Sequence, residues 1–184
     1  MHSQFLLRRA IDTDNIALAQ LNQQTFLETY INEFAIPIGQ DDIDSHFHHT
    51  INPEIFAYKI ADRRQAIWVI EDKIAAKLIA FANVGPCFLP HPDVRAGEDG
   101  EIDRIYVRRD QQGYGLGQSL LNVILPWFEE NFPGRPVWLG VWAGNKKARK
   151  FYERYHFKTV GDRDYKVGDY IFNSVIMRRE NFLE

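Results

Sequence analysis

Three glycines spaced two residues apart mark the part of this sequence whose chemistry is easiest to predict. Gly113, Gly115 and Gly117 follow an alternating segment at 101–107 that predicts a strand, and they precede a segment with helical periodicity. Backbone N–H groups gathered there, with the partial positive charge of a helix N-terminus, suit a diphosphate. The loop lacks the Gly-Lys-Ser/Thr ending of a Walker loop and the spacing of the dinucleotide fingerprint. On its own, the pattern also fits an ordinary tight turn in which glycine supplies φ > 0.

The segment downstream adds residues that could transfer a proton and bind an amide. An apolar run at 136–142 predicts a second strand, and Asn145 follows it. Ala148, Phe151 and Tyr152 come next at helical spacing. A phenol such as Tyr152 can protonate a leaving thiolate, because a free thiol has a pKa of about 8.5.

Together these two segments resemble the GNAT superfamily of acyl-CoA-dependent N-acetyltransferases. The family's Gln/Arg-x-x-Gly-x-Gly/Ala motif is matched by Gln112, Gly115 and Gly117. Its later Asn…Ala…Phe-Tyr…Phe signature is matched by Asn145, Ala148, Phe151, Tyr152 and Phe157. His156 stands where the family usually has glycine before the last Phe. Residues 25–30 and 138–142 are more loosely similar to the bacterial spermine/spermidine acetyltransferase branch.

The resemblance implies acetyl-CoA as co-substrate and direct attack by an amine in a ternary complex. It implies that the pyrophosphate lies on the backbone N–H groups of residues 112–118, and that Asn145 binds the pantetheine arm in the gap between two splayed strands. A backbone N–H near Ile105 or Tyr106 would hold the oxyanion. The residues assigned to the cofactor are Ile105, Tyr106, Val107, Gln112, Gly113, Tyr114, Gly115, Leu116, Gly117, Gln118 and Asn145.

Tyr152 and Glu101 are the candidate catalytic residues. Tyr152 matches the family tyrosine that protonates the thiolate, and Glu101 lies where many members carry a base. An alkylammonium with a pKa of about 10.4 needs such a base at neutral pH. Alternation along 101–107 predicts that Glu101 shares a face with Asp103, Ile105 and Val107. The alternatives are a solvated carboxylate paired with Arg104 for Glu101, and a core aromatic for Tyr152.

The rest of the sequence predicts the elements that must position these residues. They are a strand at 5–9, a helix from an N-cap at Asp12 or Thr13 to about Tyr30, short helices at 41–50 and 53–61, a hairpin of 66–71 and 73–84 with Asp72 at its turn, an irregular segment at 85–100, and a closing hairpin of 158–165 and 170–178. Pro126 falls inside the helix after the glycines and should kink or unwind it. We predict a single α/β (α+β) domain over residues 1–184, with a GNAT-type mixed central sheet of about seven strands, helices on both faces and a splayed parallel strand pair.

Composition argues against several classes of protein. A chain of 184 residues, 45% of them hydrophobic, can bury one core, and a net charge of −3 does not favour nucleic-acid binding. We expect neither a signal peptide nor a membrane span. Cys87 is the single cysteine, which predicts a cytoplasmic location and a small apolar role for this residue. His46, His48 and His49 lack completing ligands, so we expect no metal.

The acceptor is left open by the sequence, although a small-molecule amine is the first hypothesis. The first helices and the 85–100 segment should form its pocket, with Glu28 and Tyr30 as candidate substrate-binding residues. The acidic residues Asp41, Asp42, Asp44, Glu98 and Asp99 would suit a polyamine there, or serve only for solubility. The alternatives are a protein N-terminal or lysine acetyltransferase, and a non-catalytic acyl-CoA-binding sensor. A homodimer is a further hypothesis.

Overall fold

A seven-stranded sheet forms the centre of the computed structural model, which describes residues 4–180. The strand order is β1-β2-β3-β4-β5-β7-β6, and every neighbouring pair is antiparallel except β4 and β5. The strands are β1 (Phe5–Arg9), β2 (Ala66–Asp72), β3 (Lys77–Pro86), β4 (Gly100–Val107), β5 (Val137–Trp142), β6 (Lys158–Val167) and β7 (Tyr170–Arg179). The predicted mixed sheet with one parallel pair is therefore confirmed.

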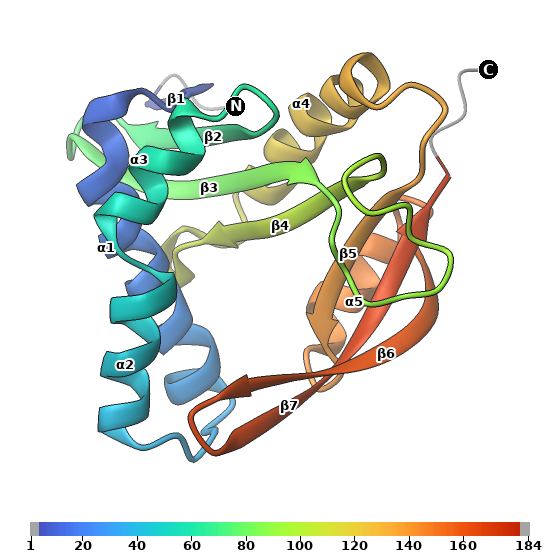
Figure 1. Ribbon diagram of the computed structural model, residues 1–184. Helices are drawn as coiled ribbons and strands as arrows, with labels where there is room; N and C mark the ends of the chain where they lie inside the picture. The colour runs from blue at the N-terminus through green and yellow to red at the C-terminus, as the bar shows by residue number, and fades with distance from the viewer. Residues whose placement is uncertain (1–3, 181–184) are drawn as a thin grey trace.

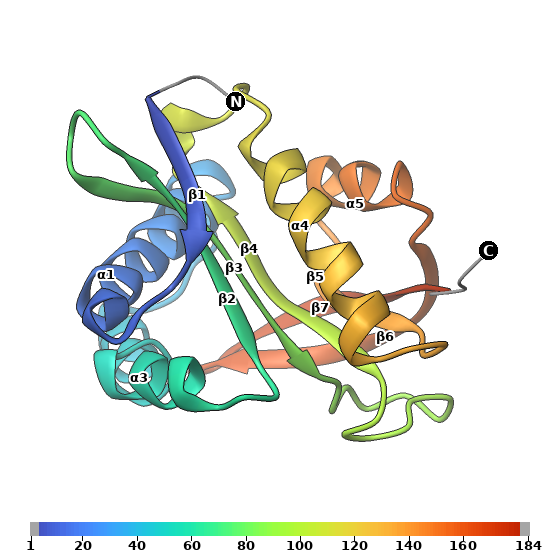
Figure 2. The ribbon, with the colours of Figure 1, turned by 90° about the horizontal axis from the view of Figure 1, so that it is seen from above.

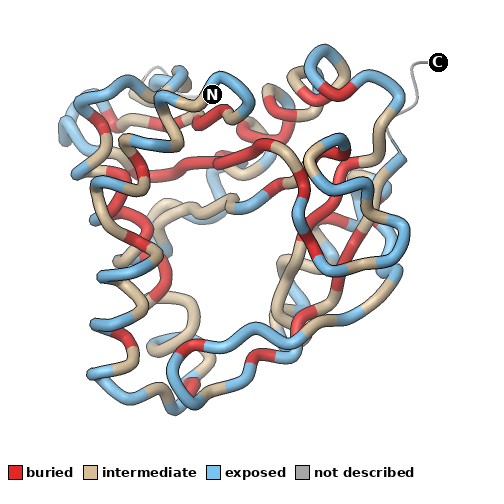
Figure 3. Tube along the Cα trace, in the orientation of Figure 1, coloured by how far each residue is buried: buried red, intermediate tan, exposed pale blue. Residues whose placement is uncertain are grey.

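Helices cover both faces of this sheet. They are α1 (Asn15–Phe26), α2 (Gln40–Thr50), α3 (Pro53–Ala61), α4 (Leu116–Asn131) and α5 (Lys146–Glu153). Viewed from above, α1 and α3 lie on one side of the β1–β4 strands, with α4 and α5 on the other (Figure 2). Each side has its own core: Leu18, Phe56 and Phe81 are buried on the α1 side, and Leu120 and Phe128 on the α4 side. Figure 3 shows buried residues along most of β3, which both cores cover.

The first helix is longer than predicted and changes type along its length. It begins after a short 3₁₀ turn (Asp12–Asp14), where the Asp14 carboxylate accepts from Ile11 N at 2.8 Å. After Phe26 it continues as a π-helix, Leu27–Glu33, in which Phe34 N donates to Thr29 O at 3.1 Å. The sequence from 15 to 36 has neither glycine nor proline, so no residue stops the helix at Tyr30.

Two other local predictions need correction. Asp72 ends β2, and the turn follows it, because the Asp72 carboxylate accepts from Ile74 N and Ala75 N. Helix α4 continues through Pro126, so the predicted local unwinding is wrong, while the alternative, a kink, stays a prediction. Within residues 4–180, no helix is both long enough and apolar enough to cross a membrane.

The two halves of the sheet separate between β4 and β5. Their pairing covers only Gly100–Val137, Glu101–Trp138 and Ile102–Leu139, and beyond these residues the strands diverge (Figure 1). The β4 edge that faces β5 is therefore unpaired from Asp103 onward, and its backbone groups can bind something else. This arrangement is the splayed parallel pair that the family resemblance implies.

A β-bulge at Asp103 changes the direction of the β4 side chains. On β3, the neighbours Asn83 and Val84 pair with Arg104 and Ile102, so Asp103 is the additional residue on β4. Ile102, Ile105 and Val107 consequently all pack into the core on the α4 side. The predicted alternation, which put Glu101 on the face of Ile105 and Val107, is wrong, because the bulge shifts the phase of the strand by one residue.

Candidate active site

A cavity of about 760 Å³ lies where the C-terminal end of β4 meets the first turns of α4 and α5. Most residues that the sequence assigned to the cofactor line it: Ile105, Tyr106, Val107, Gln112, Gly113, Gly115, Leu116, Gly117, Gln118 and Asn145. Tyr152 lines it as well. Tyr114 is the exception, since its side chain is 56% exposed and packs edge-on against Phe5. We name this space the loop cavity.

The glycine loop presents backbone N–H groups to the loop cavity. A 3₁₀ turn, η3 (Arg109–Gln111), leads into it, and Gly115 caps α4 with φ of 74°. Ser119 N donates to Gly115 O, which leaves Leu116, Gly117 and Gln118 as first-turn N–H donors without an intrahelical acceptor. A Cβ atom at Gly115 would find nothing within 4 Å, so the surface beside this residue is open. Such a turn can accept an anion at close range.

Side chains on both sides hold the loop in place. The Glu28 carboxylate accepts from Arg109 N at 2.9 Å, and Lys147 Nζ donates to Gln112 Oε1 at 2.7 Å. Glu28 therefore contacts the backbone that precedes the glycines. It lines neither the loop cavity nor the smaller cavity on the other face of β4, which is described below. Helix α5 carries four basic residues, Lys146, Lys147, Arg149 and Lys150, and of these only Lys147 lines the loop cavity.

Asn145 and Tyr152 are positioned by opposite ends of α5. Asn145 caps the helix, and its Oδ1 accepts from Ala148 N at 3.0 Å. Tyr152 is 9% exposed and packs with Phe151 and Phe157 in the core on the α4 side. Burial, together with the neighbouring Tyr106, raises the pKa of the Tyr152 phenol above its usual 10, so at neutral pH the phenol keeps its proton.

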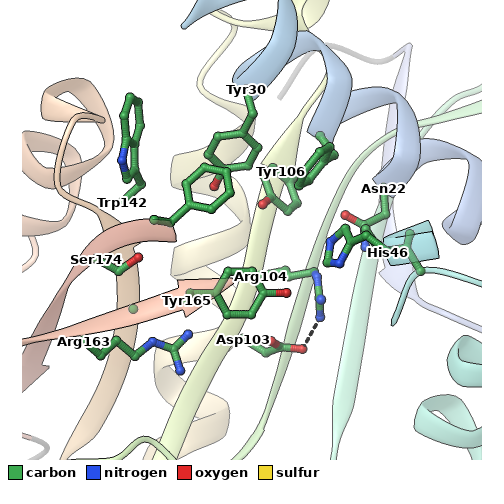
Figure 4. A pocket seen from close by; sticks show the side chains of 14 residues that line it. Asn22, Tyr30, His46, Asp103, Arg104, Tyr106, Trp142, Arg163, Tyr165 and Ser174 are labelled. Atoms are coloured by element: carbon green, nitrogen blue, oxygen red, sulfur yellow. Dashed lines mark hydrogen bonds and ion pairs between the residues drawn. The ribbon is translucent and has the colours of Figure 1, made fainter. Parts of the chain in front are cut away.

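A second cavity, of about 130 Å³, lies on the other face of β4 (Figure 4). Its lining comes from α1, the π-helix, α2, β4 to β7 and the residue after α2: Asn22, Phe26, Tyr30, His46, Ile51, Asp103, Arg104, Tyr106, Gly140, Trp142, Arg163, Tyr165, Phe172 and Ser174. We name it the inner cavity. Tyr106 lines both cavities, so they meet at this residue.

The inner cavity contains Tyr30 but none of the expected acidic residues of α2 and the 85–100 segment. Asp42 lies against Gly168 at the tip of the β6–β7 hairpin and does not line the cavity. Asp99 is 1% exposed and accepts from Trp138 Nε1 at 2.9 Å and Arg135 Nη2 at 2.6 Å. Asp99 therefore anchors the segment before β4, because its carboxylate is already fully used away from the cavity.

The charged residues of the inner cavity are mainly cationic. Asp103 is its single carboxylate, and it bonds both Lys59 Nζ and the Arg104 guanidinium. Burial alone would raise the pKa of Asp103, but these two cations outweigh it and lower the pKa to about 2. Burial, and then Arg104, lowers the pKa of His46 to about 4, so this imidazole is neutral at pH 7.

Glu101 does not line the inner cavity, although Asp103, two residues along β4, does. Its carboxylate accepts from Phe88 N at 3.2 Å. Burial, and then the nearby Asp103 carboxylate, raises the pKa of Glu101 above its usual value. Of the two carboxyl groups on β4, Glu101 is therefore the more basic.

Two alternative chemistries, a cysteine nucleophile and a metal site, receive no support from the described residues. Cys87 is fully buried, and burial raises the pKa of its thiol to about 12, so it is a poor nucleophile at neutral pH. No cluster of three His, Cys, Asp or Glu side chains suited to a metal occurs in the described part of the chain.

Sequence reasoning missed the residues that give the inner cavity its character: Asn22, Asp103, Arg104 and Arg163. A signal was present for some of them. Asp103 and Arg104 interrupt an apolar strand, and Asn22 falls among the apolar residues of α1. Arg163 gave no comparable signal, because it alternates with aspartates as on any solvated strand.

Comparison with known proteins agrees with this geometry. The sequence profile described as the Acetyltransferase (GNAT) family matches residues 18–157. An uncharacterised N-acetyltransferase of Mycobacterium bovis is 26% identical over 170 residues, covering 91% of this chain and 98% of the relative. The spermine/spermidine N(1)-acetyltransferase of Bacillus subtilis is 27% identical over 90 residues, covering 48% of this chain and 57% of the relative. The crystal structure of PaiA N-acetyltransferase from Thermoplasma acidophilum with coenzyme A has the same fold, with a TM-score of 0.71, 18% identity and coverage of 96% and 98%.

Proposed function

Because the chain belongs to the GNAT acetyltransferase family, an N-acetyltransferase family that uses acetyl-CoA, we propose that it acetylates the primary amine of a small molecule in a ternary complex. The observation that carries this proposal is the meeting of two cavities at Tyr106, one on each face of the splayed strand β4. Acetyl-CoA occupies the loop cavity, and the acceptor occupies the inner cavity.

Backbone groups do most of the cofactor binding. The pyrophosphate lies on the N–H groups of Leu116, Gly117 and Gln118, where the N-terminus of α4 adds partial positive charge. The pantetheine arm extends along the unpaired edge of β4 past Ile105 and Val107. Asn145 donates from its side-chain nitrogen, since its oxygen already caps α5.

The reaction is a direct displacement on the thioester. The amine nitrogen attacks the carbonyl carbon, a C–N bond forms, and a backbone N–H of the unpaired β4 edge near Ile105 or Tyr106 stabilises the oxyanion. As the intermediate collapses, the C–S bond breaks and the Tyr152 phenol gives its proton to the departing thiolate. The high pKa of Tyr152 keeps that proton in place until the thiolate forms.

Glu101 accepts the amine proton through water. Glu101 and Tyr106 are five positions apart on β4, which at about 3.3 Å per residue puts them roughly 16 Å apart along the strand. A direct transfer over that distance is excluded, so water must carry the proton from the inner cavity past its lining to Glu101, which lies outside that lining. Asp103 is the poorer base, because its two cationic partners hold it ionised and weakly basic.

The small volume of the inner cavity, about 130 Å³, favours a small acceptor over a protein. A polypeptide substrate needs an open groove, whereas the hairpin tip at Gly168 meets α2 at Asp42. A non-catalytic acyl-CoA sensor would need no acidic group beside the thioester, yet the protonated Tyr152 lines the loop cavity. A polyamine acceptor is supported by the names of the Bacillus relatives and receives no support from the charge of the inner cavity.

A thiol-release assay tests the proposal. Purified protein with acetyl-CoA is offered polyamines, amino acids, aminoglycosides and short peptides, and free coenzyme A is measured. We expect amine-dependent release with at least one small molecule, and an increase in melting temperature with acetyl-CoA but not with ATP or NAD. If acetyl-CoA at saturating concentration does not stabilise the protein, the proposal is wrong.

A further inference from the structure

The inner cavity contains an arginine with no anionic partner. Arg163, from β6, forms no ion pair with any residue of 4–180, and its Nε has no hydrogen-bond partner there. The guanidinium instead lies 5.7 Å from the centre of the Tyr165 ring. In Figure 4 this guanidinium points into the cavity between Ser174 and Asp103.

Small residues on the neighbouring strands make room for this arginine. Arg163 pairs with Ser174 on β7, and the side chain then extends over Gly140 on β5. A Cβ atom at Gly140 would lie 3.2 Å from Arg163 Nη2, which is too close for an unstrained contact. The sheet therefore directs Arg163 toward the inside of the cavity, where it is half-buried.

The opposite wall provides a second polar group without a partner. Asn22 is 1% exposed, and both its Oδ1 and its Nδ2 lack a hydrogen-bond partner within the described chain. It lines the inner cavity from α1. A buried amide with neither group satisfied indicates that a ligand or water completes it.

The local charge favours an anionic ligand. Arg104 and Arg163 line the cavity with Asp103 as the single carboxylate, and Lys59 bonds that carboxylate from outside. His46 is neutral at pH 7 and Tyr165 keeps its proton, since burial raises its pKa. The Asp103 and Glu101 carboxylates both act on Arg163 electrostatically without coming within ion-pair distance of it. The positive charges therefore exceed the negative ones around the space that an acceptor would fill.

We propose that the acceptor is a primary amine that carries a carboxylate, as a free amino acid does. The inference rests on the proposed function, whose acceptor side it specifies. Arg163 binds the carboxylate with its two parallel N–H groups, Asn22 completes a second polar contact, and the amine points to Tyr106 and the thioester. Phe26, Trp142 and Phe172 form an aromatic wall that suits an apolar side chain on the acceptor.

Matched acceptors test the proposal. Thiol release is measured with L-phenylalanine, its amide and phenethylamine, with L-leucine and isopentylamine, and with 4-aminobutyrate and putrescine. We expect kcat/KM to be at least 10-fold higher for carboxylate-bearing members than for their uncharged or cationic counterparts. Equal or faster turnover of phenethylamine, isopentylamine or putrescine overturns the inference and leaves the acetyltransferase proposal intact.

Variants assign the preference to Arg163. In Arg163→Gln we expect the ratio of kcat/KM between phenylalanine and phenethylamine to fall at least 10-fold, with KM for acetyl-CoA within 2-fold of wild type. Arg163→Lys should recover part of the ratio, because it restores charge without the planar fork. Arg63→Gln, at an exposed site in the α3–β2 loop, is the matched control and should keep the ratio. An unchanged ratio in Arg163→Gln contradicts the assignment.

A binding measurement covers the case in which no member of the panel is turned over. The protein saturated with coenzyme A is titrated with the same compounds, and the fluorescence of Trp142, which lines the cavity, is compared with that of Trp142→Phe. Binding of at least one carboxylate-bearing amine, weakened at least 10-fold in Arg163→Gln, supports the inference. If coenzyme A binds and none of these amines does, the inference is wrong; if coenzyme A does not bind, the proposed function fails first.

Discussion

Replacing Gly115 with alanine should separate the folding role of the glycine loop from its binding role. Gly115 has φ of 74°, and an L-residue in this conformation costs about 1–2 kcal/mol. For a chain of this length, each kcal/mol lowers the melting temperature by about 2–4 °C. The Cβ atom meets no protein atom within 4 Å, so we expect a loss of about 2–8 °C in the free protein and no further disruption.

The effect on acetyl-CoA should be much larger than the effect on folding. A ligand at 100 times its Kd stabilises the native state by about 2.7 kcal/mol. The new methyl group would occupy the surface that the pyrophosphate must approach, and a 100-fold weaker Kd would leave about 0.4 kcal/mol of that stabilisation. Thermal melts with and without acetyl-CoA, together with a calorimetric Kd, measure both quantities.

Gly134→Ala supplies the matched control. Gly134 also has a left-handed backbone, with φ of 67°, and a Cβ atom there meets nothing within 4 Å. It follows α4 and does not line the loop cavity. The two variants should lose similar stability, and only Gly115→Ala should lose binding. A Gly115→Ala protein that keeps the full acetyl-CoA shift would refute the backbone cradle, as would a Gly134→Ala protein that loses it equally.

Three further predictions concern proton transfer and burial. Tyr152→Phe should lower kcat by roughly 100-fold or more, the usual contribution of a general acid, with KM for acetyl-CoA nearly unchanged; Tyr58→Phe, at an exposed site, is the control, and equal turnover would remove Tyr152 from the chemistry. The base must be ionised, so kcat/KM should fall as the pH drops through the raised pKa of Glu101. Glu101→Gln should lose this decrease at acidic pH. If the decrease persists in the variant, the group that causes it is not Glu101. His46 has a folded pKa of about 4 against 6.5 unfolded, so only the unfolded state gains a proton as pH falls between these values. In urea unfolding, the free energy of unfolding of the wild type should therefore decline across this pH window more steeply than that of His46→Gln. His48→Gln, at an exposed site, is the control and should follow the wild type. Equal declines in all three proteins would contradict the role of His46.

Local patterns were sufficient to predict most elements and the loop cavity. The glycine spacing, the apolar strand at 136–142 and the helical spacing of Ala148, Phe151 and Tyr152 are each decided by neighbours in the sequence. They consequently place the start of α4, the parallel crossover and the start of α5 correctly. The assigned roles of Tyr152 and Glu101 remain predictions that the experiments above address.

Features that depend on pairing between distant segments could not be predicted in this way. The bulge at Asp103 exists only in the register between β3 and β4, and one strand read alone gives a regular alternation. Asn22 and Arg163 line the same cavity only because the β6–β7 hairpin returns over α1 and α2, which brings together segments more than a hundred positions apart. Exposed aspartates on α2 therefore looked as suitable for the acceptor as the residues that line the cavity.

The π-helix makes the active site sensitive to the length of one short segment. Thr29 and Glu33 on this segment line the loop cavity, while Tyr30 lines the inner cavity. Each residue of an α-helix turns the chain by about 100°, so removing one residue between Leu27 and Glu33 would restore ordinary helical winding and swing Tyr30 away from Tyr106. A single-codon deletion would thereby change the acceptor side of the site, and it would also disturb the contact between Glu28 and Arg109 N that supports the glycine loop.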